Sequence, residues 1–85
     1  MALGMIECFG FVTSVVVADK GLKTADVELV AIDKNKPANA DKCEVPLVMV
    51  VKFEGNVAAV EMAVEAGKAE AEKRGMFGES KIALV

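Results

Sequence analysis

The chain has 85 residues, with 13 acidic and 10 basic side chains for a net charge of −3, and it is 54% hydrophobic before its 7 glycines are counted. Typical globular chains reach about 45–50% apolar residues with glycine included, so a chain this short has more apolar surface than it can bury within itself. The acidic balance excludes a basic nucleic-acid-binding face, and no run of about 18–20 apolar residues is present to span a membrane. We therefore expect a cytoplasmic protein, folded as one domain over residues 1–85, that binds neither nucleic acid nor membrane and buries apolar surface against other copies.

The first third of the sequence predicts a strand, a helix and a second strand. Leu3–Cys8 is a short apolar strand, and Gly10 allows the turn that follows it. Apolar residues then recur at spacings of four and three, the pattern of a single buried helical stripe that leaves Thr13 and Ser14 mostly outside it. The expected stripe consists of Phe11, Val15, Ala18, Leu22 and Ala25. Alternating residues over Asp26–Asp33 predict the second strand.

A polar segment, Lys34 to Glu44, predicts a loop in the middle of the chain. The strand predicted after it, Val45–Phe53, is apolar on both faces, which is typical of a central strand. Pro46 cannot donate a hydrogen bond to a neighbouring strand and therefore belongs at the start of this one.

The last third predicts a second helix and a short final strand. Asn56 is a good N-cap for a helix that runs from Val57 to about Arg74, and Gly75 ends this helix. Its expected buried stripe consists of Val57, Val60, Val64, Gly67 and Ala71. The final strand is predicted at Ile82–Val85.

The predicted order of elements, β-α-β-β-α-β, indicates the α+β class. We expect one antiparallel four-stranded sheet with two helices on one face, a ferredoxin-like arrangement. Two helices cover only one face of such a sheet, so the remaining apolar surface is expected to meet a neighbouring copy.

The sequence contains no set of residues that suits catalysis or metal binding. It has no histidine, so Cys8 and Cys43 have no partner base, and two distant cysteines are not a metal-ligand set. Cys8 is expected to be a small core residue. The carboxylates of the second helix are expected to form a solvated face rather than an acid–base pair; they are Glu61, Glu65, Glu70 and Glu72. We therefore expect no enzyme activity, no catalytic residue, no metal and no cofactor.

Five short motifs, in order and at compatible spacings, resemble the hexamer-forming shell proteins of bacterial microcompartments, the BMC domain family. They are Gly4-Met5-Ile6-Glu7 followed by Gly10, the passage from Ala18-Asp19 through Lys23 to Val27 and Leu29-Val30, Asp33-Lys34, Gly55-Asn56-Val57, and Val64 with Ala66-Gly67. The resemblance implies a structural shell protein that forms flat hexameric tiles with a central pore for small metabolites. It also implies that the partners are other copies of this chain and other shell proteins, within the shell of a microcompartment in the cytoplasm.

The resemblance also implies roles for particular residues. Lys23 corresponds to the lysine that lies at the hexamer edge in this family, against a neighbouring hexamer. The pore residues of the family follow the second strand, and here this pore loop comprises Asn35, Lys36, Pro37, Ala38, Asn39, Ala40, Asp41 and Lys42. The loop is much longer than the usual Ile-Gly-Ser-Gly segment, so a different pore width or charge is expected.

Simpler interpretations remain open from the residues alone. Without the resemblance, Lys23 would be an ordinary solvated helix lysine. The long loop would be a disordered loop on the protein surface. The main alternative function is a small-ligand-binding regulatory module of ferredoxin-like topology, acting as a dimer or trimer and binding an amino acid or nucleotide in clefts between chains. The oligomeric mass separates the two functions, because a hexamer favours the shell protein.

Overall fold

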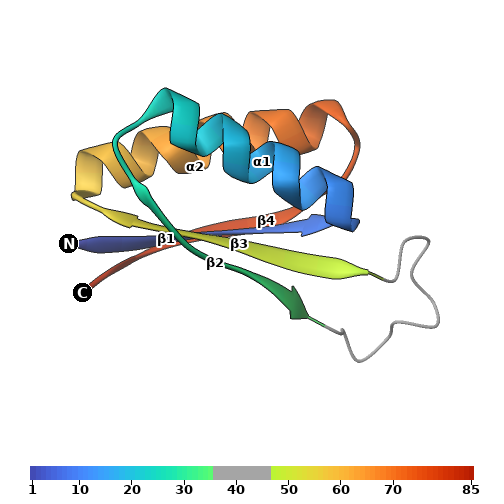
Figure 1. Ribbon diagram of the computed structural model, residues 1–85, viewed down its shortest axis with the longest axis horizontal. Coiled ribbons are helices and arrows are strands. Elements are labelled where there is room, and N and C mark those ends of the chain that lie inside the picture. Colours follow the sequence, from blue (N-terminus) through green and yellow to red (C-terminus); the bar gives the residue numbers. More distant parts are fainter. Residues whose placement is uncertain (36–46) are drawn as a thin grey trace.

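The computed structural model describes residues 1–35 and 47–85. The elements are β1 (Ala2–Phe9), α1 (Phe11–Thr24), β2 (Glu28–Asn35), β3 (Val48–Gly55), α2 (Val57–Lys73) and β4 (Phe77–Leu84). The four strands form one antiparallel sheet in the order β2-β3-β1-β4, and both helices lie on the same face of it (Figure 1). The predicted element order and α+β class are therefore confirmed. None of the helices in the described ranges is both long and apolar enough to cross a membrane.

The two central strands, β1 and β3, supply the floor of the core. β1 alternates strictly between buried and half-buried residues, and Ile6 and Cys8 on its buried side are fully covered by the helices. Ile6 pairs with Val51 and Cys8 with Met49, so the two strands present one apolar surface to the helices. The central position predicted for the third strand is confirmed, although β3 begins at Val48 rather than Val45.

Helix α2 begins and ends where the sequence predicts. The Asn56 side chain accepts a hydrogen bond of 2.8 Å from the backbone N–H of Ala59, and Gly75 ends the helix with a φ of +68°. Its buried residues are Val60, Ala63, Val64, Gly67 and Ala71. The expected stripe was thus right except at Val57, which is 38% exposed because the first residue of a helix has no preceding turn beside it.

Glycines allow the helices to approach the sheet closely. A Cβ atom at Gly4 of β1 would lie 2.7 Å from Val60 and 2.5 Å from Val64 of α2. A Cβ atom at Gly67 would lie 2.6 Å from Ile6 and 3.0 Å from Val17 of α1. Real Cβ atoms do not approach other atoms so closely, so the spacing of both helices depends on these glycines.

Helix α1 contradicts the predicted stripe. Its buried residues are Thr13, Ser14, Val17, Ala18 and Gly21. Three residues expected inside, Phe11, Val15 and Leu22, are instead 58%, 45% and 43% exposed, and Ala25 lies beyond the helix as its C-cap. The space between α1, α2 and β3 is narrow, so small residues fill it and the large ones lie outside. The buried Ser14 hydroxyl is satisfied because it donates to the carbonyl oxygen of Phe11 at 2.5 Å.

Each edge strand contains a register irregularity, and both strands differ from their predicted bounds. In β2, Leu29 pairs with Phe53 and Ala31 with Lys52, so Val30 lies in a bulge and is 51% exposed. In β4, a second irregularity lies opposite the Ile6–Cys8 stretch of β1. β4 begins at Phe77, five residues before the predicted start, because its pairing with β1 continues through that irregularity.

Candidate functional site

Lys23 lies in the last turn of α1 and points into solvent. Its side chain is 73% exposed, and its Nζ forms an ion pair of 2.9 Å with Asp19, one helical turn earlier. An exposed pair at this spacing contributes only about 0.3–0.5 kcal/mol to stability, so Lys23 is not held in place by the fold. The side chain is therefore available for contacts outside the chain.

Asn35 is the only member of the predicted pore loop within the described residues. It ends β2 and pairs with Val48 at the start of β3, while Lys36 through Lys42 lie outside the described ranges. Lys23 lies near the opposite end of β2, because α1 and β2 run in opposite directions (Figure 1). A strand of eight residues spans about 25 Å, so the expected edge residue and the start of the expected loop are well separated.

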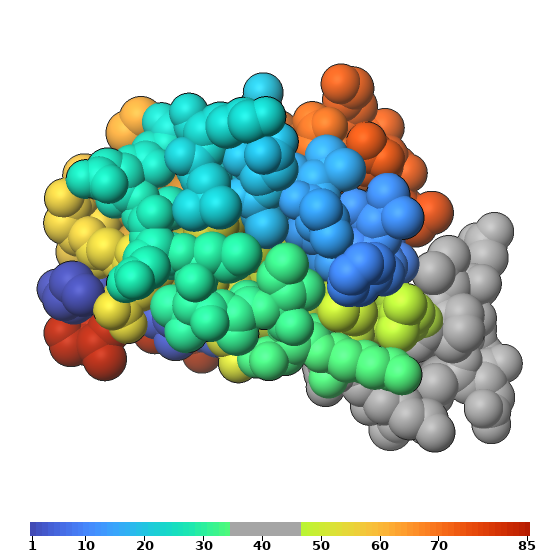
Figure 2. Space-filling model, viewed as in Figure 1, coloured from blue at the N-terminus to red at the C-terminus, as the bar shows by residue number. Residues whose placement is uncertain are grey.

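The first exposed apolar surface lies on α1 and the adjacent edge strand β2. We call it the α1 flank; it comprises Phe11, Val15, Leu22 and Val30. α1 and β2 lie side by side on the face seen in Figure 2, with β2 below the helix. Its helical residues form the periodic stripe that the sequence predicts to be buried, and the structure exposes them instead.

The second exposed apolar surface lies at the other edge of the sheet. We call it the β4 flank; it comprises Met1, Ile82, Leu84 and Val85. The backbone N–H of Val85 donates to the carbonyl oxygen of Met1 at 3.1 Å, which keeps the two ends of the described chain together. Ile82 and Leu84 pair with Gly4 and Ala2, whose side of the sheet faces the helices, yet they remain exposed. No pattern in the sequence predicted this surface.

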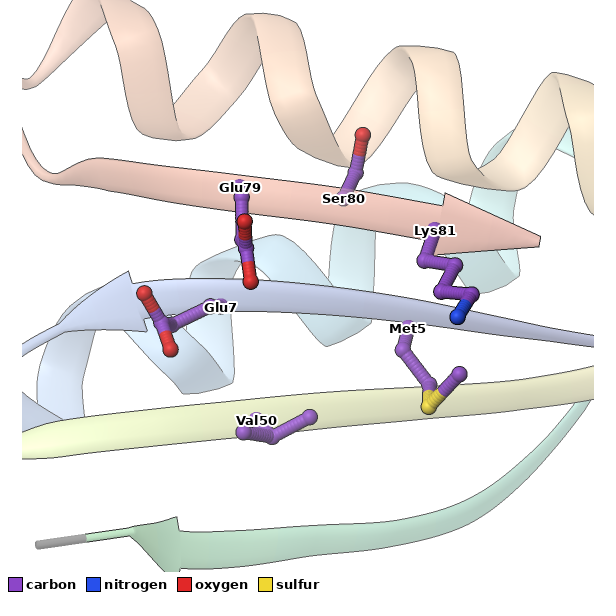
Figure 3. Close-up of a pocket in the computed structure, with 6 residues that line it drawn as sticks. All are labelled: Met5, Glu7, Val50, Glu79, Ser80 and Lys81. Carbon is purple, nitrogen blue, oxygen red and sulfur yellow. The ribbon is translucent and has the colours of Figure 1, made fainter. Parts of the chain in front are cut away.

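The face of the sheet opposite the helices carries charged residues and one shallow hollow of about 230 Å³. The hollow is lined by Met5, Glu7, Val50, Glu79, Ser80 and Lys81. Figure 3 shows that the Ser80 side chain points toward the helix layer, while Glu7 and Glu79 extend over β1 and β4. Nearby, Lys52 and Asp33 form an ion pair of 2.7 Å across β3 and β2. This face is therefore mixed, with charged side chains around the apolar Met5 and Val50, and it differs in character from the two flanks.

The Cys8 thiol is a poor candidate for chemistry. It is fully buried in the core, and desolvation, together with the nearby Glu7 carboxylate, raises its pKa from 9.0 to about 11. The thiol is consequently neutral at physiological pH and is not an activated nucleophile. The expectation that Cys8 is a core residue is confirmed, and Cys43 lies outside the described residues.

Comparisons with known proteins agree with this fold. A family model described as the BMC domain matches residues 2–83. The structure is also similar to the crystal structure of a microcompartments protein from Desulfitobacterium hafniense DCB, with a TM-score of 0.78 and 34% sequence identity. That similarity covers 95% of this chain and 41% of the other one, so this chain spans less than half the length of its structural relative.

Proposed function

This chain belongs to the BMC domain family, and from that membership we propose that it is a structural shell protein whose copies form hexameric tiles of a bacterial microcompartment. The match of the family across residues 2–83 carries the proposal, because it includes every helix and all but the last residue of the final strand. In this proposal residues 1–85 act as one shell domain.

We propose that the end of β2 at Asn35 faces the centre of the hexamer and that Lys23 lies at its rim. Asn35 ends β2, whereas Lys23 lies in the last turn of α1, near the start of that strand. An eight-residue strand spans about 25 Å, and this separation suits a subunit with one end at the centre and the other at the rim. The exposed and weakly held Lys23 side chain suits a contact with a neighbouring hexamer. The loop from Asn35 to Lys42 would then surround the central pore.

The proposed pore admits small metabolites, and its loop contributes to the selection between charges. The segment from Lys34 to Lys42 contains three lysines and one aspartate, a net charge of +2 in each chain. Six copies would place like charges around one axis, which favours small anionic or neutral metabolites over cations.

We propose further that the protein has a structural role rather than a catalytic one. The family is generally structural, and the buried Cys8 thiol, with a pKa near 11, does not suit nucleophilic chemistry. Its partners would be identical copies, other shell proteins and the metabolites that cross the pore. Its place would be the shell of a microcompartment within the cytoplasm.

Native mass spectrometry and negative-stain electron microscopy of the purified chain test this proposal. We expect a hexameric mass at micromolar concentration and rings or sheets on the grid. A monomer alone at all concentrations up to about 100 μM, where the free energy of association is still only about −5.5 kcal/mol, would contradict the proposal. A dimer or trimer would instead favour the alternative of a small-ligand-binding regulatory module.

A further inference from the structure

The hollow on the sheet face opposite the helices holds charged side chains of both signs. Figure 3 shows Glu7 and Glu79 toward one end of it and Lys81 toward the other. Within residues 1–35 and 47–85, none of these three side chains forms a salt bridge. We propose that this hollow binds a small aliphatic zwitterion, an amino acid whose ammonium and carboxylate groups are separated by a short methylene chain.

The strands fix the separation between the negative and the positive end of the hollow. Glu79 and Lys81 are two residues apart on β4, and both extend from this strand toward β1 (Figure 3). Two residues of a strand span about 7 Å. Lys81 pairs with Met5 of β1, so the lysine lies beside the apolar Met5 rather than beside Glu7. A ligand that meets both ends therefore needs its own two charges apart.

The Glu7 side chain is accommodated by a gap in the neighbouring strand. A Cβ atom at Gly78 would lie 2.5 Å from Oε1 and 3.1 Å from Cδ of Glu7, so the carboxylate lies over the bare backbone of β4. The register between β1 and β4 also shifts here, between Ile6 and Cys8. Such irregularities often redirect a side chain next to a functional site. Here the glycine lets the Glu7 carboxylate reach the strand that carries Glu79.

The charges at the two ends suit the two groups of an amino acid. A primary ammonium has three N–H donors, so it can donate to the carboxylates of both Glu7 and Glu79. The Lys81 ammonium has donors only and suits a carboxylate at the other end. The nearby Lys52 is already paired with Asp33 at 2.7 Å, so Lys81 is the lysine of this hollow that is left for a ligand.

The lining between the charged ends suits a methylene chain of limited length. Met5 and Val50 are half-buried apolar residues of the hollow, and burial of a methylene group against them is favourable. The volume of about 230 Å³ is below the range of about 300–1,000 Å³ that is usual for larger organic ligands. Because exposed ion pairs are weak, we expect a dissociation constant of about 1–10 mM.

Saturation-transfer difference NMR tests the class of ligand, since it detects weak binding to the protein in any state of assembly. The probe is 4-aminobutanoate, and its comparison compounds are butylammonium, butanoate and the isomer 2-aminobutanoate, whose two charges share one carbon. We expect 4-aminobutanoate to bind about three- to fivefold more tightly than each of them. Equal affinity of butylammonium would overturn the role of Lys81 and with it the zwitterion. Equal affinity of the isomer would overturn the separation of the charges.

Variants test the position of the site. Glu79→Gln and Lys81→Gln remove one charge from each end, and we expect each to raise the dissociation constant of 4-aminobutanoate about three- to fivefold. Glu65→Gln is the matched control, because Glu65 is an exposed glutamate of α2, on the other side of the sheet. If the Glu79 and Lys81 variants bind as tightly as the control, the hollow is not the site.

Gly78→Ala tests the contribution of Glu7 without removing its charge. The new Cβ atom displaces the far end of a flexible side chain, so we expect unchanged circular dichroism together with weaker binding of the probe. Unchanged binding in a variant that is folded would show that the Glu7 carboxylate does not contact the ligand.

The site lies within one chain, so its test is independent of the proposed hexamer. If the protein forms a hexamer and does not bind 4-aminobutanoate, the proposed function stands and this inference is wrong. If the protein binds the probe with the expected preferences but never forms a hexamer, this inference stands and the proposed function fails.

Discussion

The tip of the Phe53 phenyl ring lies against the bare backbone of Gly21, so that β3 and α1 meet where a side chain is missing. A Cβ atom at Gly21 would come within 2.9 Å of both Cε atoms of the ring, and Phe53 is fully buried and cannot swing away. This contact sets the distance between α1 and the sheet, and through it the direction in which the larger α1 residues point.

Gly21→Ala should therefore destabilise the protein even though alanine favours helices. Alanine gains up to about 1 kcal/mol in helix propensity, whereas overpacking a buried site costs about 1–3 kcal/mol. We expect a net loss of about 1–2 kcal/mol in the free energy of unfolding, measured by chemical denaturation. Combining it with Phe53→Leu should cost less than the sum of the two single changes, because the smaller side chain relieves the clash. A stabilised Gly21→Ala variant would show that the ring does not determine this spacing.

Val64→Asp should abolish soluble protein, whereas Glu65→Ala should leave soluble yield and stability nearly unchanged. Val64 is 5% exposed in the centre of the buried face of α2, and an unpaired carboxylate there costs several kcal/mol. Glu65 is exposed, and its loss should change the free energy of unfolding by less than about 0.5 kcal/mol. Soluble yield and the midpoint of thermal unfolding provide the comparison. Similar behaviour of the two variants would contradict the orientation of α2.

Lys23→Asp should prevent sheets of hexamers while leaving the hexamers intact. The side chain makes only an exposed ion pair with Asp19, so the fold should lose no more than about 0.5 kcal/mol. Electron microscopy reports the sheets, and native mass spectrometry reports the hexamers. Lys20→Asp serves as the control, because Lys20 is another exposed lysine of α1. Normal sheets from the Lys23 variant would make this residue an ordinary surface lysine.

The buried Cys8 thiol should make stability depend on pH in the alkaline range. The folded state raises the pKa of Cys8 from 9.0 to about 11, so between these values the folded chain keeps a proton that the unfolded chain releases. The stabilisation is complete below pH 9 and is lost as the pH rises toward 11, by up to about 1.4 kcal/mol per pH unit. Urea unfolding at increasing pH gives the free energy of unfolding of Cys43→Ser and of Cys43→Ser/Cys8→Ala. Lysine titration affects both variants, so the difference between their pH slopes reports the Cys8 thiol. Equal pH slopes would show that the thiol ionises as freely in the fold as outside it.

The pore loop is expected to govern which metabolites cross the shell. Replacing Lys36 and Lys42 with glutamate changes the net charge of the segment from Lys34 to Lys42 from +2 to −2 in each chain. Two like charges about 10 Å apart in water repel by about 0.4 kcal/mol, and this adds up over a ring of six copies. Entry of an anionic substrate into intact shells should therefore slow, while a neutral substrate of similar size provides the control. Unchanged anion entry would show that this loop does not control the pore.

The sequence by itself determined the order of elements and most of α2. The N-cap at Asn56 and the stop at Gly75 are local signals, because a hydrogen bond to the backbone and a positive φ depend on neighbouring residues. The central position of β3 also followed from sequence, since an apolar run on both faces is typical of a central strand. The motifs resembling the BMC domain family also pointed to the correct family from the sequence alone.

Only the tertiary structure decided which apolar residues lie inside. The stripe of Phe11, Val15 and Leu22 has a valid helical period, but Gly21 meets Phe53 so closely that the small face of α1 turns inward. The bulge at Val30 likewise depends on pairing between strands that are distant in sequence. The periodic spacing of apolar residues shows that a helix has an apolar face. The space that the neighbouring elements leave determines whether that face is buried in the core or exposed on the surface.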